Sequence, residues 1–97
     1  MEKLSIIITE DDNWYAEFIK HAISLTGDYN IQIVGTAEQL MKKLNAQPDI
    51  VTLDFNLPDA KGEKILEQIK IKCPESKVVI ISGQEDVQIA VNLLSKG

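Results

Sequence analysis

The sequence predicts an α/β fold in which a doubly wound parallel sheet is flanked by helices. Four short apolar runs rich in β-branched residues alternate along the chain with amphipathic segments of helical length. Runs such as Ile6-Ile7-Ile8 and Val78-Val79-Ile80-Ile81 do not alternate apolar with polar residues, which is typical of strands covered on both faces. Because strand–helix–strand units cross over in the right-handed sense, we expect the helices to cover both faces of one sheet.

Composition limits the kind of protein. The chain has 97 residues, 44% hydrophobic and 26% charged, as expected of one globular domain. Its formal net charge of −5 opposes a surface that neutralises many phosphates, so we predict no direct nucleic-acid partner. No apolar run approaches the roughly 20 residues of a membrane span, and the N-terminus lacks the apolar region of a secretory signal. We therefore expect a cytoplasmic protein that does not enter a membrane.

The predicted elements follow in order. The strands are the apolar runs Leu4–Thr9, Ile31–Val34, Ile50–Leu53 and Val78–Ile81. The first helix follows the first strand and ends at Gly27-Asp28, and its predicted core-facing stripe is Tyr15, Phe18, Ile19, Ala22 and Ile23. Trp14 is expected to pack at the start of this helix, and His21 to face solvent.

Three further helices are predicted. Thr36 and Gln39 have the spacing of a capping box, which predicts a helix to about Asn45. The next helix follows Gly62 and stops before Pro74, with Cys73 as its buried last residue. The last helix spans about Glu85–Lys96 and carries two apolar stripes, one of Val87, Ala90, Val91 and Leu94 and a second of Ile89 and Leu93.

Acidic residues stand where two predicted strands end. Glu10-Asp11-Asp12 follows the first strand and Asp54 follows the third, so a parallel sheet brings them to one edge. Several carboxylates this close favour a bound cation, and hard oxygen ligands suit Mg²⁺. A carboxylate beside such an ion can act as a nucleophile toward phosphorus. Taken separately, the triplet could instead cap a helix, and Asp54 could be a turn residue.

These segments together resemble the receiver domains of response regulators in two-component signalling. Leu4–Asp12 is similar to the first strand and acid pair of that family, and Asp49–Asp59 to its phosphoacceptor strand and turn. Gly62 stands at the position of the turn glycine, and Val78–Gly83 resembles the fourth strand with its switch hydroxyl. The resemblance implies flavodoxin-like receiver topology with strand order 2-1-3-4, one of the common orders of doubly wound sheets.

The resemblance also implies a role for each site residue. Asp54 is the phosphoacceptor, and Asp11 is a direct Mg²⁺ ligand. Glu10 holds the ion through water, and the backbone carbonyl of Asn56 completes the ligands from the protein. The implied function is a signalling switch, not an enzyme in its own right, that takes its phosphoryl group from a sensor histidine kinase or a phosphotransfer protein.

Two residues after the fourth strand complete the implied site. Ser82 is the switch hydroxyl that hydrogen-bonds a phosphate oxygen, although a hydroxyl at a strand end is the plainer interpretation. Gly83 is small where a larger residue would crowd the phosphate, and a turn glycine is the alternative.

The sequence departs from the family at its C-terminus. The family continues into a fifth strand, with a lysine that pairs with the phosphate, and a fifth helix, so residues 1–97 are expected to form a receiver domain incomplete at that end. The fourth strand would then lie at the sheet edge, apolar on both faces. We therefore predict self-association through Val78–Ile81 and the last helix.

Other functions fit less well. A receiver-like interaction module that takes no phosphate is the main alternative, because the family lysine is missing. A phosphatase of the haloacid dehalogenase type would need a second aspartate where Asn56 stands. A dinucleotide-binding fold lacks its glycine-rich turn, since Glu10-Asp11-Asp12 occupies that place.

Overall fold

The computed structural model describes residues 3–95, apart from the side chains of Gln84 and Glu85. Its elements, in chain order, are β1 (Ser5–Thr9), α1 (Asn13–Ser24), β2 (Asn30–Val34), α2 (Ala37–Lys43), the short 3-10 helix η1 (Leu44–Ala46), β3 (Ile50–Leu53), α3 (Gly62–Lys72), β4 (Lys77–Ile80) and α4 (Gln84–Ser95). Each predicted strand and helix is present. β3 has its predicted bounds, and the ends of the other elements differ from the prediction by at most three residues. Lys96, the predicted end of the last helix, lies outside the described residues.

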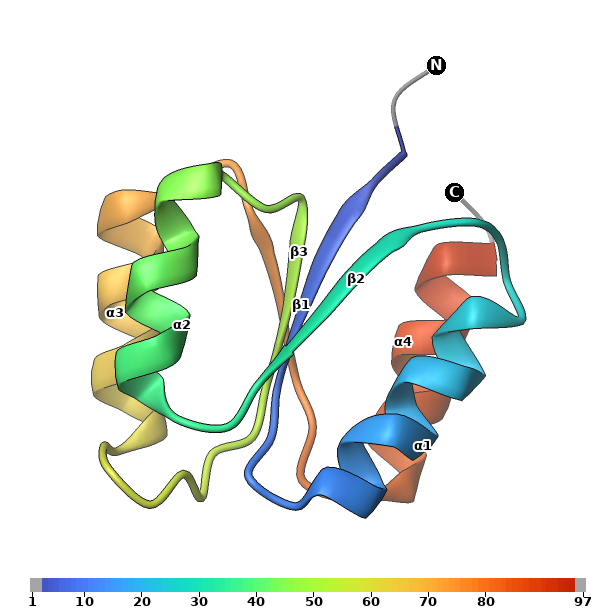
Figure 1. Ribbon diagram of the computed structural model, residues 1–97, viewed down its shortest axis with the longest axis horizontal. Coiled ribbons are helices and arrows are strands. Elements are labelled where there is room, and N and C mark those ends of the chain that lie inside the picture. The colour runs from blue at the N-terminus through green and yellow to red at the C-terminus, as the bar shows by residue number, and fades with distance from the viewer. Residues whose placement is uncertain (1–2, 96–97) are drawn as a thin grey trace.

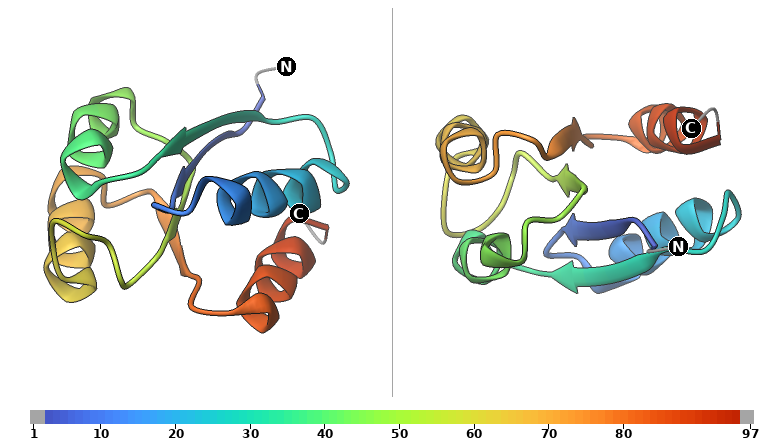
Figure 2. Two further views of the ribbon diagram at one scale, coloured as in Figure 1. Left: turned by 60° about the horizontal axis from the view of Figure 1, so that its bottom comes forward. Right: turned by 90° about the horizontal axis from the view of Figure 1, so that it is seen from above.

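The four strands form one parallel sheet in the order β2-β1-β3-β4, as the family resemblance implied. The sheet lies between two pairs of helices, with α2 and α3 on one face and α1 and α4 on the other (Figure 1). Seen from above, β2 and β4 lie at the two edges of the sheet (Figure 2). The predicted doubly wound α/β fold is confirmed.

Successive residues of β1 supply the two halves of the core. Ile6 and Ile8 pack with the buried side chains of α1, whereas Ile7 packs with those of α2 and α3. All three isoleucines are at most 4% exposed. A strand buried on both faces has no polar face, which explains why β1 appears in the sequence as a continuous apolar run.

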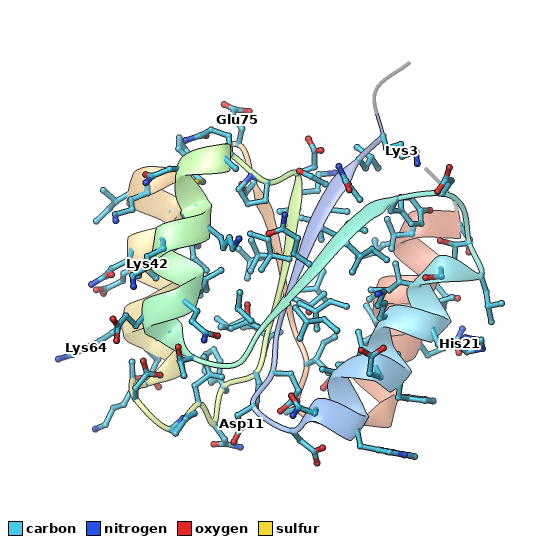
Figure 3. The ribbon with its side chains drawn as sticks, in the orientation of Figure 1. Lys3, Asp11, His21, Lys42, Lys64 and Glu75 are labelled. Atoms are coloured by element: carbon cyan, nitrogen blue, oxygen red, sulfur yellow. The ribbon has the colours of Figure 1, made fainter. Side chains whose placement is uncertain are left out.

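The predicted stripe of α1 is wrong at Phe18. The buried line is Ala16, Ile19 and Ile23, while the Phe18 side chain is 38% exposed. Trp14, expected to pack at the start of this helix, is 76% exposed, and its ring stacks on that of Phe18 with the centroids 6.3 Å apart. The orientation of α1 turns the small Ala16 toward the sheet and leaves the rings of Trp14 and Phe18 outside the buried interface between helix and sheet. His21 points away from the sheet, as predicted (Figure 3).

The first turn of α2 follows the predicted capping box only in part. The Thr36 side chain accepts a hydrogen bond from the backbone N–H of Gln39, 3.1 Å away. The Gln39 side chain accepts from the N–H of Gly35, at 2.8 Å, rather than from that of Thr36. Cys73 is buried at the end of α3, where its thiol donates to the carbonyl of Leu44.

The last strand is less covered than its sequence suggested. In β4, Val78 and Val79 are half-buried and Ile80 is 38% exposed, because β4 pairs only with β3 among the described strands. The prediction that both faces of this run are covered is therefore wrong. The two stripes of α4 are confirmed: Val87 and Ala90 are buried, whereas Ile89 and Leu93 are 52% and 58% exposed.

Candidate functional site

Three carboxylates meet at the carboxyl edge of the sheet. Because β1 and β3 pair in parallel, Glu10 and Asp54 emerge side by side, and the N–H of Asp54 donates to the carbonyl of Thr9 at 3.0 Å. Glu10, Asp11 and Asp54 each offer an oxygen within 4.8 Å of the others. Asp11 lies at this edge in Figure 3, far from the labelled lysines Lys3, Lys42 and Lys64. The expected convergence of residues 44 positions apart is present.

Backbone hydrogen bonds orient the individual carboxylates. The Asp54 carboxylate accepts from the N–H of Asn56 at 2.9 Å, which folds the turn after β3 back over it. The Asp12 carboxylate caps α1 by accepting from the N–H groups of Trp14 and Tyr15. Capping therefore explains Asp12, and the oxygens of Asp11 remain available to the cluster.

The burial of Glu10 and the mutual repulsion of the three carboxylates favour a bound cation. Glu10 is only 6% exposed, and its burial, together with hydrogen bonding to Asp54 and Asp11 and the charge of Asp54, raises its pKa to about 7. Its hydrogen bond from the N–H of Asp12 acts in the opposite direction. Within residues 3–95 no lysine forms an ion pair with these three carboxylates. A proton or a cation is thus the available means of relieving the repulsion.

The turn after β3 is tied to the neighbouring helix. Asp59 accepts hydrogen bonds from the N–H groups of Ala37 and Glu38, at 2.8 and 3.0 Å, and these bonds lower the pKa of its carboxyl. The carboxylate thereby caps the N-terminus of α2 from a residue more than 20 positions away. No local pattern predicts this contact, because the capping residue and the helix belong to different segments of the chain.

Ser82 and Gly83 follow β4 at the same edge of the sheet, but the described contacts do not join them to the acidic cluster. Ser82 is exposed, and both its N–H and its hydroxyl donate to the carboxylate of Asp86. A Cβ added at Gly83 would meet no atom within 4 Å, so no protein contact requires glycine there. Asp86 was not among the predicted residues. The capping-box pattern after β4 is Ser-x-x-Glu, from Ser82 to Glu85, so the sequence pattern would not have pointed to Asp86.

Tyr15 contributes a buried polar atom near the site. Its hydroxyl is buried and has no hydrogen-bond partner among the described residues. Burial raises the pKa of this hydroxyl, as do the charges of Glu10, Asp86 and Asp54. The phenol therefore stays protonated and offers a hydrogen-bond donor to an environment of carboxylates.

Comparison with known proteins decides the family. The family model described as the response regulator receiver domain matches residues 6–97. The chain belongs to this family. As a receiver domain it is 32% identical over 98 residues to the chemotaxis protein CheY of Listeria monocytogenes, a match that covers 97% of the chain and 80% of CheY. It is 30% identical to the DNA-binding transcriptional regulator NtrC of Proteus hauseri, but covers only 20% of that longer protein.

Solved structures agree with the fold of the receiver domain. The signal receiver domain of a LuxO repressor protein from Vibrio parahaemolyticus superposes with a TM-score of 0.77 at 28% identity, covering 99% of this chain and 74% of that one. A CheY-like receiver domain protein from Methanospirillum hungatei gives a TM-score of 0.75 at 23% identity, over 94% of this chain and 75% of that one. The chain is thus a receiver domain of two-component signalling. None of its described helices has the length and apolar character needed to cross a membrane.

The acidic cluster suits the Mg²⁺ that receiver domains typically bind. Its three candidate ligands are hard carboxylate oxygens converging within 4.8 Å. The pKa of Glu10 is raised first by burial and then by Asp54 and Asp11, so its charged form is one that a divalent cation would stabilise. Mg²⁺ usually keeps several waters and takes few protein ligands, which matches a cluster open to solvent at Asp11. The donor set therefore fits the ion.

Proposed function

We propose that this receiver domain is a phosphorylation-dependent switch in which Asp54 accepts a phosphoryl group from a cytoplasmic histidine kinase or phosphotransfer protein. The observation that carries the proposal is the convergence of Glu10, Asp11 and Asp54 within 4.8 Å at the edge of the sheet. Of the three, Asp54 follows the central strand β3 and is half-buried, so a donor can reach it from the open edge.

The transfer is a displacement at phosphorus. An oxygen of the Asp54 carboxylate forms a new bond to the phosphorus of a phosphohistidine, while the bond between phosphorus and the imidazole nitrogen breaks. The bonding electron pair stays on that nitrogen, which takes up a proton, and the histidine leaves as neutral imidazole. The product is an acyl phosphate on Asp54. The hydrogen bond from the N–H of Asn56 to the Asp54 carboxylate holds the nucleophile in one orientation before attack.

Asp11 and Asp54 are the proposed direct ligands of Mg²⁺, with Glu10 acting through water and Asn56 through its backbone carbonyl. When bound, the ion offsets the negative charge that develops on the phosphoryl oxygens. Because the pKa of Glu10 is raised to about 7, a proton on this buried carboxyl competes with the cation at acidic pH, and the carboxylate is available to it above neutral pH. Ser82 is the proposed donor to a phosphoryl oxygen, and Gly83 the residue that leaves room for it.

The proposal is tested by loading the purified protein with Mg²⁺ and a small phosphodonor such as acetyl phosphate. Mass spectrometry is expected to show one added phosphoryl group in the wild type and none in Asp54→Asn.

The fluorescence of the exposed Trp14, four residues after Glu10, is expected to change when Mg²⁺ is titrated, because the ion alters the charge beside the first turn of α1. Asp28→Asn, which changes an exposed aspartate far from the cluster in the sequence, is the matched control for the loss of one charge. No added mass in the presence of Mg²⁺ would refute the switch.

A receiver-like interaction module is the second candidate. The observation that favours it is that no lysine of residues 3–95 pairs with the cluster, so none of these residues supplies a positive charge that would face a phosphoryl group. A fluorescence response to Mg²⁺ without phosphoryl uptake would support this candidate over the switch.

The exposed margin beside β4 is the proposed site of self-association. Ile80 on the edge strand and Ile89 and Leu93 on α4 are all more than a third exposed. Ile80 faces the α3 side of the sheet, whereas the two α4 residues belong to the opposite side. A second copy can add a strand to the side of β4 that has no partner among the described strands, and its flanking elements would cover the apolar side chains on each side. Light scattering is expected to show a concentration-dependent dimer, whereas a monomer at millimolar concentration would contradict the proposal.

A further inference from the structure

The contact between Ser82 and Asp86 links the site to α4. Oδ2 of Asp86 accepts two hydrogen bonds from Ser82, one from its N–H at 2.8 Å and one from its hydroxyl at 3.0 Å. Asp86 lies in the first turn of α4, and its own N–H donates to the carbonyl of Gly83 at 3.1 Å. Ser82 and the start of α4 are thereby closed into one small hydrogen-bonded ring.

The Ser82 hydroxyl has a single proton to donate, and in this structure it is donated to Asp86. A carboxylate is a stronger acceptor than a neutral oxygen, and the two bonds from Ser82 hold the pKa of the Asp86 carboxyl below its usual range. Asp86 thus remains an ionised acceptor throughout the neutral range. For the hydroxyl to reach any other acceptor, its bond to Asp86 must first be broken.

We propose that Asp86 is a positioning residue that competes with the phosphoryl group for the Ser82 hydroxyl. The inference rests on the proposed function, because the competing acceptor is a phosphoryl group on Asp54. In the unmodified domain the hydroxyl is held by Asp86, and occupation of the site withdraws it. The acceptor that loses its partner is then a carboxylate in the first turn of α4, so the state of Asp54 is communicated to the helix that carries the exposed Ile89 and Leu93.

The bond between Ser82 and Asp86 therefore opposes phosphoryl binding. Part of the free energy of binding a phosphoryl group is used to break the bond between Ser82 and Asp86. Removing the Asp86 carboxylate is therefore expected to tighten binding at the site. A role limited to capping α4 predicts the opposite pattern, in which the substitution lowers the stability of the fold and leaves affinity at Asp54 unchanged.

The test is a double-mutant cycle with beryllofluoride, a non-covalent mimic of the phosphoryl group, in the presence of Mg²⁺. The proteins are the wild type, Asp86→Ala, Ser82→Ala and the double variant, and affinity is read from Trp14 fluorescence and, independently, from ¹⁹F NMR. Asp86→Ala is expected to bind about threefold to tenfold more tightly than the wild type, the range of the net effect of one ordinary hydrogen bond. In the Ser82→Ala background the same substitution is expected to change nothing, because the hydroxyl is absent.

Each other outcome is informative. Equal affinity of the wild type and Asp86→Ala overturns the inference while leaving the proposed function intact. A gain that persists in the Ser82→Ala background also overturns it, since the effect is then one of net charge alone. If no variant binds beryllofluoride, both the inference and the proposed function fail. Asp86→Asn retains an oxygen acceptor without the charge, so if Asp86→Ala does not fold, a partial gain in Asp86→Asn that is absent in the Ser82→Ala background supports the inference, and a gain that persists there overturns it.

Discussion

Substitution of Asp54 by asparagine is expected to stabilise the metal-free domain at alkaline pH. Asparagine keeps an oxygen that accepts the hydrogen bond from the N–H of Asn56, so the turn after β3 is preserved. What is lost is one of three negative charges whose oxygens lie within 4.8 Å of one another. Relief of this repulsion is the physical basis of the expected gain.

The magnitude follows from distance and burial. Two unit charges about 5 Å apart repel by about 1 kcal/mol in a water-like medium and by about 3 kcal/mol at the effective dielectric constant of a protein surface. Because Asp54 is half-buried and Asp11 is exposed, the lower part of this range applies. We expect the free energy of unfolding to rise by about 1 to 2 kcal/mol at pH 8.5.

The same substitution changes the pH dependence of stability through Glu10. Its pKa is about 7 in the folded protein against an ordinary value of 4.5, so the folded state holds this proton more tightly than the unfolded state. Stability associated with this group is complete below pH 4.5 and is lost as the pH rises toward 7, by at most about 3 kcal/mol. Asp54→Asn removes the charge and the side-chain hydrogen bond that help to raise this pKa, so the loss is expected to be smaller.

Urea denaturation in EDTA, followed by circular dichroism between pH 5 and 8.5, measures both effects. Asp28→Asn is the matched control and is expected to leave the pH profile unchanged, since Asp28 pairs only with the exposed Lys3. Added Mg²⁺ is expected to stabilise the wild type more than Asp54→Asn. If Asp54→Asn lowers stability at pH 8.5, or leaves the slope with pH unchanged, the reasoning from crowded carboxylates is wrong.

Three further substitutions test the fold around the site. Gly62→Ala is expected to cost about 1 to 3 kcal/mol of stability in urea, because the new methyl group would collide with the ring of Phe55; an unchanged midpoint would contradict this packing. Tyr15→Phe is expected to change the free energy of unfolding by less than the roughly 1 kcal/mol of an ordinary hydrogen bond, since the Tyr15 hydroxyl has no partner among the described residues, and a larger loss would reveal one. Asp59→Ala removes two acceptors at the start of α2, so amide exchange should accelerate there and not in α3; uniform acceleration would point to global destabilisation instead.

The sequence alone determined the architecture and the convergence of the acidic residues. Runs without a polar face predict parallel strands between two helical layers, and parallel strands bring their carboxyl ends to one edge. From this it followed that Glu10, Asp11 and Asp54 would lie together, as the structure has them. These features depend on periodicity and on position at strand ends, which are local properties of the chain.

Only the tertiary structure decided the features that depend on how the segments pack. The orientation of α1 exposes Phe18, and the edge position of β4 leaves Ile80 partly uncovered, although both residues belong to apolar patterns. The raised pKa of Glu10 and the capping of α2 by Asp59 arise between segments distant in sequence. Even the short-range bond of Ser82 to Asp86 depends on the angle at which α4 leaves the sheet. Such contacts are set by distance and desolvation in the folded state, which side-chain periodicity does not encode.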